Sequence, residues 1–200
     1  MIRRLRDETA GDVAHDYLDD PDDARVKLPR AAQVERLKAL LEMETQRAAK
    51  QPRQIYLLDR TVLTFLAHEY ALMCLRRPNA WSIATSRVLS STIIVPDHIY
   101  LLHCTAATRR ARWRARRLSM NSQYIQPEFN LHFYRFFALL KSSLRISVVS
   151  NGAIRSGVGA RRILRDEEKA GRINRGWLLA DLRRIDKLLR ANPCERRSLR

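Results

Sequence analysis

Residues 55–69 read Ile-Tyr-Leu-Leu-Asp-Arg-Thr-Val-Leu-Thr-Phe-Leu-Ala-His-Glu, and this stretch is the strongest indication of the fold class. Four apolar residues end at the pair Asp59-Arg60, and a largely apolar helical stretch follows from Val62 to Leu75. A short apolar run that is closed by charged residues and followed by a helix is typical of a buried parallel strand. The stretch therefore predicts one strand and the helix that follows it.

The segments on either side continue this alternation. A helix is predicted over residues 30–50, where Val34, Leu37, Leu41 and Ala48 recur at helical spacing. Further strands are predicted over 12–17, 99–102 and 146–149, and further helices over 2–9, 81–91, from 105 onward, over 127–140 and in two segments at the end of the chain. Alternating strands and helices predict an α/β fold with three layers, α/β/α, around a mostly parallel sheet. Such sheets bind ligands at the carboxyl ends of their strands.

Positive charge is concentrated in the second half of the 200 residues. The chain has 38 basic and 21 acidic residues and a formal net charge of +17. Residues 1–100 carry 15 basic and 14 acidic residues, whereas residues 101–200 carry 23 and 7. Such an excess attracts polyanions, which include nucleic acid, an acidic membrane surface and the phosphates of a nucleotide. Charge alone does not choose among them.

The composition also excludes several classes of protein. The chain is 46% hydrophobic and 30% charged, which is not the composition of a disordered protein. No apolar run approaches the roughly 18 residues of a membrane helix, and no apolar stretch typical of a signal peptide follows the N-terminus. Cys74, Cys104 and Cys194 are widely spaced and odd in number, which favours a reducing cytoplasm over a disulfide framework or a zinc site. The five histidines lack metal-ligand spacing, and Cys104 is expected in the core.

Asp59 and Arg60 are the first candidates for chemistry. A carboxylate at the end of a strand is placed to hold a magnesium ion or to orient a hydroxyl group. A neighbouring arginine can bind a phosphate through its planar guanidinium. The alternative is that Asp59 caps the next helix and Arg60 is a solvated charge.

Six arginines fall within residues 109–117. On a helix, positions 109, 112 and 116 lie on one side and positions 110, 114 and 117 on another. Like charges at this density repel one another, and the phosphates of a nucleotide or a nucleic acid would relieve the repulsion. A merely solvated basic face is the alternative.

The order of these motifs resembles the thymidylate kinase family. Residues 59–69 resemble the family pattern Asp-Arg-x-x-x-Ser-x-x-Ala-x-Gln, with Thr64 in place of Ser and Glu69 in place of Gln. Pro96-Asp97 before a strand and the spacing to the arginines also match, and residues 148–152 resemble the last strand and the loop beside the adenine. The resemblance spans roughly residues 30–170.

The resemblance implies phosphoryl transfer from ATP with Mg²⁺ to a small acceptor, a reaction that depends on positioning and charge neutralisation. It implies that Asp59 assists the metal or the acceptor and that Arg60 binds the acceptor phosphate. Thr64 and Glu69 would line the acceptor pocket. The implied lid arginines are Arg112, Arg114 and Arg116, and Asn151 and Gly152 would lie beside the adenine. Glu69 replaces a glutamine, and His103-Cys104 follows the strand predicted over 99–102 where the family has an acidic residue. The identity of the acceptor therefore stays open between a nucleotide, a nucleoside and another hydroxyl compound.

One motif of such kinases is missing from the sequence. No Gly-x-x-x-x-Gly-Lys-Ser/Thr loop occurs, and Gly11 is the only glycine before residue 152. In the resembling family this loop follows the central strand, so we expect that roughly 20 to 30 residues precede the chain as given. Without them the sheet is expected to split into two halves with unpaired edges, and the chain to bind ATP poorly. The expected organisation is one kinase-like domain over residues 1–192, with a lid at about 109–126, and a basic tail over 193–200.

A second hypothesis is a basic nucleic-acid-binding protein without catalysis. Arginines followed by aromatic residues can bind single strands by stacking. The aromatic side chains at helical spacing are, however, better explained as core: Phe129, Phe133, Phe136 and Phe137. A regulatory pseudokinase is the third hypothesis. The oligomeric state stays open, with a homodimer as one alternative.

Overall fold

A computed structural model describes residues 12–14, 30–49, 56–58, 61–115, 117, 125–140, 144–150 and 175–191. These residues form an α/β structure with parallel strands, as predicted. The predictions for residues 2–9, for the first closing helix and for the tail over 193–200 lie outside this part of the chain. Among the described helices, none combines the length and apolar character needed to cross a membrane.

The strands form two separate parallel ladders. Strand β1 (Asp12–Ala14) pairs with β2 (Tyr56–Leu58), and β3 (Ile99–His103) pairs with β4 (Ile146–Ser150). Strand β1 covers the first three residues of the segment predicted over 12–17, and the other three lie outside the described part of the chain. Within the described residues each ladder has two strands, so the expectation of two half-sheets is confirmed.

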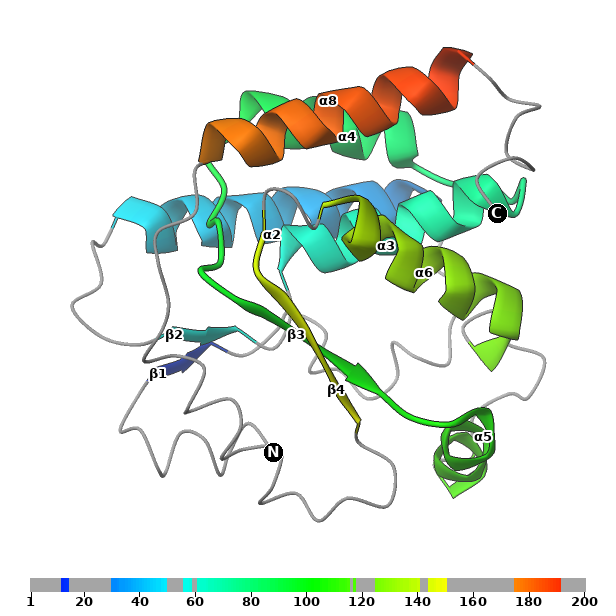
Figure 1. Ribbon diagram of the computed structural model, residues 1–200. Coiled ribbons are helices and arrows are strands. Elements are labelled where there is room, and N and C mark those ends of the chain that lie inside the picture. The colour runs from blue at the N-terminus through cyan, green and yellow to red at the C-terminus, as the bar shows by residue number, and fades with distance from the viewer. Residues whose placement is uncertain are drawn as a thin grey trace.

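The helices lie within a few residues of their predicted bounds. They are α2 (Arg30–Ala49), α3 (Val62–Cys74), α4 (Trp81–Ser90), α5 (Ala106–Ala115), α6 (Pro127–Leu139) and α8 (Arg175–Ala191). Figure 1 shows α2, α3 and α6 between the ladders and an outer pair, α4 and α8. Helix α5 lies apart from these layers, beyond the end of β3.

The core fills the space among the layered helices. Trp81 is fully buried, and its ring lies 5.8 Å from that of Tyr70 and 6.1 Å from that of Phe136. The aromatic residues of α6 are buried as predicted, with Phe133 packed against the core as a partly buried residue. Helix α8 contributes an apolar stripe of Leu178, Leu182, Ile185 and Leu189.

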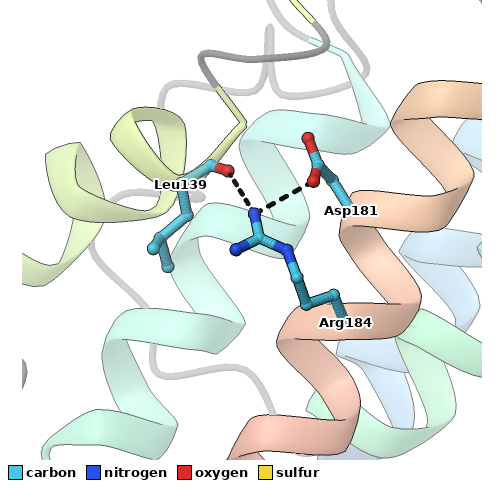
Figure 2. A network of polar contacts seen from close by, with 3 residues as sticks. All are labelled: Leu139, Asp181 and Arg184. Atoms are coloured by element: carbon cyan, nitrogen blue, oxygen red, sulfur yellow. Dashed lines mark hydrogen bonds and ion pairs between the residues drawn. The ribbon is translucent and has the colours of Figure 1, made fainter.

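Polar contacts fix α8 on the layers beneath it. Arg184 donates to the carbonyl oxygen of Leu139 at 3.2 Å and to Oδ1 of Asp181 at 2.9 Å, which joins α8 to the end of α6 (Figure 2). Asp186 accepts a hydrogen bond from Nε1 of Trp81 at 3.1 Å and pairs with Arg190 at 2.9 Å. The same carboxylate therefore satisfies the one polar atom of the buried indole and orients α8 over α4.

Candidate functional site

The carboxyl ends of the strands are the edge at which a parallel sheet binds ligands. In the second ladder, His103 of β3 lies opposite Ser150 of β4, so both strands end at one level. Four of the residues expected at this edge lie outside the described part of the chain: Asp59, Arg60, Asn151 and Gly152. The structure thus places the strand ends and the helices that follow two of them.

The beginning of α3, directly after Asp59-Arg60, is held by a double cap. The hydroxyl of Thr61 accepts a hydrogen bond from the backbone N–H of Leu63 at 3.2 Å, and the hydroxyl of Thr64 accepts one from the N–H of Thr61 at 3.4 Å. This reciprocal pattern is a capping box. Thr64, expected in the acceptor pocket, is half-buried and serves the helix terminus in this structure.

A buried carboxylate that the sequence analysis missed also holds this terminus. Glu44 of α2 is 1% exposed, and its two oxygens accept from the N–H of Val62 at 2.6 Å and from the N–H of Ile94 at 3.1 Å. The next residue, Thr45, donates its hydroxyl to the carbonyl oxygen of Thr92 at 3.0 Å. Helix α2 therefore fixes both the beginning of α3 and the segment that leads into β3.

Glu69 of α3 holds the beginning of α4 in a comparable way. It is 3% exposed, and its Oε2 accepts a hydrogen bond from the N–H of Ala80, the residue that precedes α4. A negative charge at a helix N-terminus is stabilised by the helix dipole. Glu69 thus lies buried between α3 and α4, and any part in an acceptor pocket would have to coexist with this contact.

Most of the arginine-rich stretch lies on α5 (Ala106–Ala115) in the described part of the chain. Helix α5 has no buried residue and carries Arg109, Arg110, Arg112 and Arg114. Thr105 caps its first turn by accepting from the N–H of Thr108 at 3.1 Å. Arg117 has a positive φ of 54°, and Arg116 lies outside the described residues.

The two sets of predicted site residues lie on different parts of the molecule. Thr64 and Glu69 belong to α3 in the helical layers, whereas Arg112 and Arg114 belong to α5, which lies apart from α3 (Figure 1). Cys104 is half-buried beside α5, so its expected place in the core is wrong; it follows the end of β3, where the chain turns outward.

His98 lies in a small polar cluster, and burial shifts the pKa of two other groups, His132 and Tyr70. Nε2 of His98 lies 2.9 Å from the hydroxyl of Ser147, and its Nδ1 lies 3.1 Å from the hydroxyl of Tyr100. Burial lowers the pKa of His132, assisted by the charge of Arg135, and burial raises the pKa of Tyr70. No group of three metal-ligating side chains is found among the residues that the structure describes.

Two solved structures of deoxyadenosine kinase from M. mycoides resemble this structure. One holds dCTP and gives a TM-score of 0.59; the other holds the products dCMP and a flexible dCDP and gives 0.62. Each is 12% identical to this chain, and each match covers 84% of this chain and 90% of the kinase chain. The chain shares the overall fold of these two kinase structures. No family model and no curated protein matches the sequence.

This shared fold agrees with the α/β fold class predicted from the sequence. These two structures are of a nucleoside kinase and not of a thymidylate kinase, so the resemblance is confirmed only at the level of the fold. The chain offers exposed cations for phosphate groups on α5. It does not offer the glycine-rich loop that would hold the phosphates of ATP through backbone N–H groups.

Proposed function

We propose that this chain belongs to an ATP-dependent phosphotransferase that acts on a nucleoside or nucleotide. The observation that carries the proposal is the match to deoxyadenosine kinases over 84% of the chain, with TM-scores of 0.59 and 0.62. The order of Asp59-Arg60, Pro96-Asp97 and the arginines along the same fold supports it. Among the acceptors, a deoxynucleoside is favoured, because the matching structures are deoxynucleoside kinases.

The proposed roles follow the resemblance residue by residue. Arg60 would bind the acceptor, with Asp59 beside it as the carboxylate for Mg²⁺ or for the acceptor hydroxyl. Thr64 and Glu69 would complete that pocket from α3. The arginines Arg112, Arg114 and Arg116 of a lid at about 109–126 would neutralise charge on the migrating phosphoryl group. Asn151 and Gly152 would lie beside the base of ATP.

The residues given do not fit ATP and Mg²⁺ completely. The phosphate loop is missing from the sequence, and the described residues contain no cluster that would hold the metal. We therefore assign no step to the bound nucleotide. The part of the mechanism that this chain can supply is positive charge on α5 and a fixed beginning of α3.

The split sheet supports a source for the missing loop. Within the described residues, each of the two ladders consists of two strands, so each strand is paired along one edge only. One further strand between β2 and β3 would join the two ladders into a single sheet. In a P-loop kinase such a strand leads into the phosphate loop. We propose that a segment preceding Met1 supplies both.

The intact mass of the protein isolated from its natural host tests this proposal first. A mass well above 23.3 kDa, with added residues that contain Gly-x-x-x-x-Gly-Lys-Ser/Thr, is the expected result. The protein so obtained is then assayed for transfer of the γ-phosphate of ATP to deoxyadenosine, deoxycytidine, thymidine and thymidine monophosphate. A mass of 23.3 kDa and no transfer to any acceptor would reject the proposal.

Nucleic-acid binding is the second candidate, favoured by one observation. Helix α5 exposes Arg110, Arg112 and Arg114 and contains no acidic residue. A nucleic-acid-binding protein would bind DNA or RNA with an affinity that falls steeply as salt rises, with no response to ATP. A kinase would instead respond to ATP.

The same preparation would show whether the protein is a cytoplasmic homodimer, by fractionation of the host cell and by sedimentation.

A further inference from the structure

A cavity of about 660 Å³ lies on one face of the second ladder. Its apolar walls come from three elements: Leu101 of β3, Ile146 and Val148 of β4, and Leu131 and Phe137 of α6. Small-molecule sites in proteins have volumes of about 300–1,000 Å³ and mostly apolar walls with a few polar groups. The cavity has the size and the lining of such a site.

Two apolar residues of the lining are largely open to solvent. Val148 is 56% exposed and Leu131 is 66% exposed, although both face a cavity bounded by buried residues such as Phe137. Water in contact with such walls is released when an apolar ligand covers them. This exposure therefore favours an occupant with a substantial apolar body.

The end of the cavity nearest α5 is polar and cationic. Arg109 lines it and is only half-exposed, and its guanidinium donates to the carbonyl oxygen of Cys104 at 3.4 Å. No carboxylate is found among the described lining residues, so nothing in that lining neutralises Arg109. A half-buried arginine without an anionic partner in the lining is a binding group for an anion.

Two aromatic rings lie beside this cationic end. The rings of His103 and Tyr134 are 5.8 Å apart, and the hydroxyl of Tyr134 donates to the carbonyl oxygen of Leu102 at 2.9 Å. Burial raises the pKa of Tyr134 while the charge of Arg109 opposes the rise, so the phenol remains a neutral donor. The fixed rings offer flat surfaces to an aromatic ligand.

We infer that this cavity binds a small anion with an aromatic body, its acid group on Arg109 and its rings among Val148, Leu131 and Tyr134. The described residues proposed for phosphoryl transfer do not line the cavity: Thr64, Glu69, Arg112 and Arg114. The inference is therefore independent of the proposed kinase function and holds for a chain without that activity.

Titration calorimetry with 2-naphthoate and its neutral counterpart 2-naphthamide tests the inference. The expected result is saturable 1:1 binding of 2-naphthoate to the intact chain. Arg109→Gln should weaken this binding about tenfold or more and leave 2-naphthamide unchanged, because a hydrogen bond to a charged group is lost. Arg110→Gln is the matched control: Arg110 lies on the same helix, is exposed and does not line the cavity.

Blocking variants separate the cavity from the surface of α5. Val148→Trp, and Leu131→Trp as a second variant, should abolish binding of both compounds while the circular dichroism spectrum and the thermal midpoint stay close to those of the parent chain. Both positions are exposed, so the larger side chain does not have to enter the core. Equal losses in Arg109→Gln and Arg110→Gln, unchanged binding in both tryptophan variants, or no saturable binding of 2-naphthoate would each overturn the inference.

Discussion

The layered helices and helix α5 are held in opposite ways. Helix α3 buries eight of its thirteen residues, whereas α5 buries none of its ten. The core helices are tied together by buried carboxylates on backbone N–H groups, such as Glu44 on Val62 and Glu69 on Ala80. Helix α5 is capped by Thr105, and three of its arginines are exposed, whereas Arg109 is half-exposed.

The buried helices and α5 should therefore contribute to different properties of the protein: the first to stability, the second to the proposed binding of phosphate. The free energy of unfolding depends on the buried helices, because burial of apolar surface is the main stabilising contribution. Helix α5 contributes little to it, so its like charges are tolerated and remain available for a phosphate. Substitutions in the two regions should accordingly affect different measurements.

The largest expected effect on stability comes from Trp81. Trp81→Ala should lower the free energy of unfolding by about 3–5 kcal/mol, because it opens a cavity against Tyr70 and Phe136 and leaves Asp186 without the indole. Urea denaturation followed by circular dichroism measures the loss. Trp177→Ala, at a position 64% exposed, should change it by less than about 0.5 kcal/mol. Similar losses in both variants would contradict the assignment of the core.

Glu44→Ala should follow, with a loss of about 2–4 kcal/mol, since the N–H groups of Val62 and Ile94 would lose their acceptor. The same denaturation experiment measures it. Glu42→Ala on the same helix is the control, because Glu42 is exposed. If both variants unfold at the same urea concentration, Glu44 does not hold the two segments.

Arg114→Ala tests the other region. In a preparation that transfers phosphate, the proposed role of Arg114 on the migrating phosphoryl group predicts a fall in turnover of about 100-fold, equivalent to about 2.7 kcal/mol. The free energy of unfolding should stay within about 0.5 kcal/mol of the parent. Arg60→Ala should instead raise the KM for the acceptor. Unchanged kinetics in both variants would show that these two roles are wrongly assigned.

The smallest effect is a pH dependence due to His132. Burial lowers its pKa in the folded chain, so between that value and the ordinary 6.5 the unfolded chain binds more protons. Stability is therefore full above pH 6.5 and falls as the pH is lowered through that window. His132→Phe should remove this part of the decline. The free energies of unfolding of the parent chain and of the variant are measured at pH 7.5 and at pH 5.5, and the difference between the two proteins is compared at the two pH values. If the difference in free energy of unfolding between the parent chain and His132→Phe is the same at both pH values, the effect is disproved.

Local pattern predicted the described elements well, because each depends on residues close in sequence. The stripe of α2, the apolar runs of β3 and β4 and the aromatic spacing of α6 all correspond to observed elements. The roles of individual polar residues were harder to predict. Glu44 resembles any other charge of a solvated helix, and its partners lie 18 and 50 residues away. Glu69 was predicted from a motif to face a ligand, whereas its contact with Ala80 depends on how α3 and α4 pack.

The cavity beside α5 could not be predicted for the same reason. Its walls come from β3, β4 and α6, and each wall residue looks like an ordinary strand or helix residue in the sequence. The arginines were found because six of them are clustered within residues 109–117. Which one of them turns inward depends on where β3 ends and α5 begins.

The burial of Trp81 also gives the protein an optical property. The chain contains three tryptophans: Trp81 in the core, Trp113 half-buried in the arginine helix and Trp177 exposed on α8. A buried indole emits at shorter wavelength than a solvated one, so unfolding should shift the emission of Trp81 to the red, while a ligand on α5 should alter that of Trp113. Variants that keep a single tryptophan would thus provide separate fluorescent signals for the scaffold and for the helix that it carries.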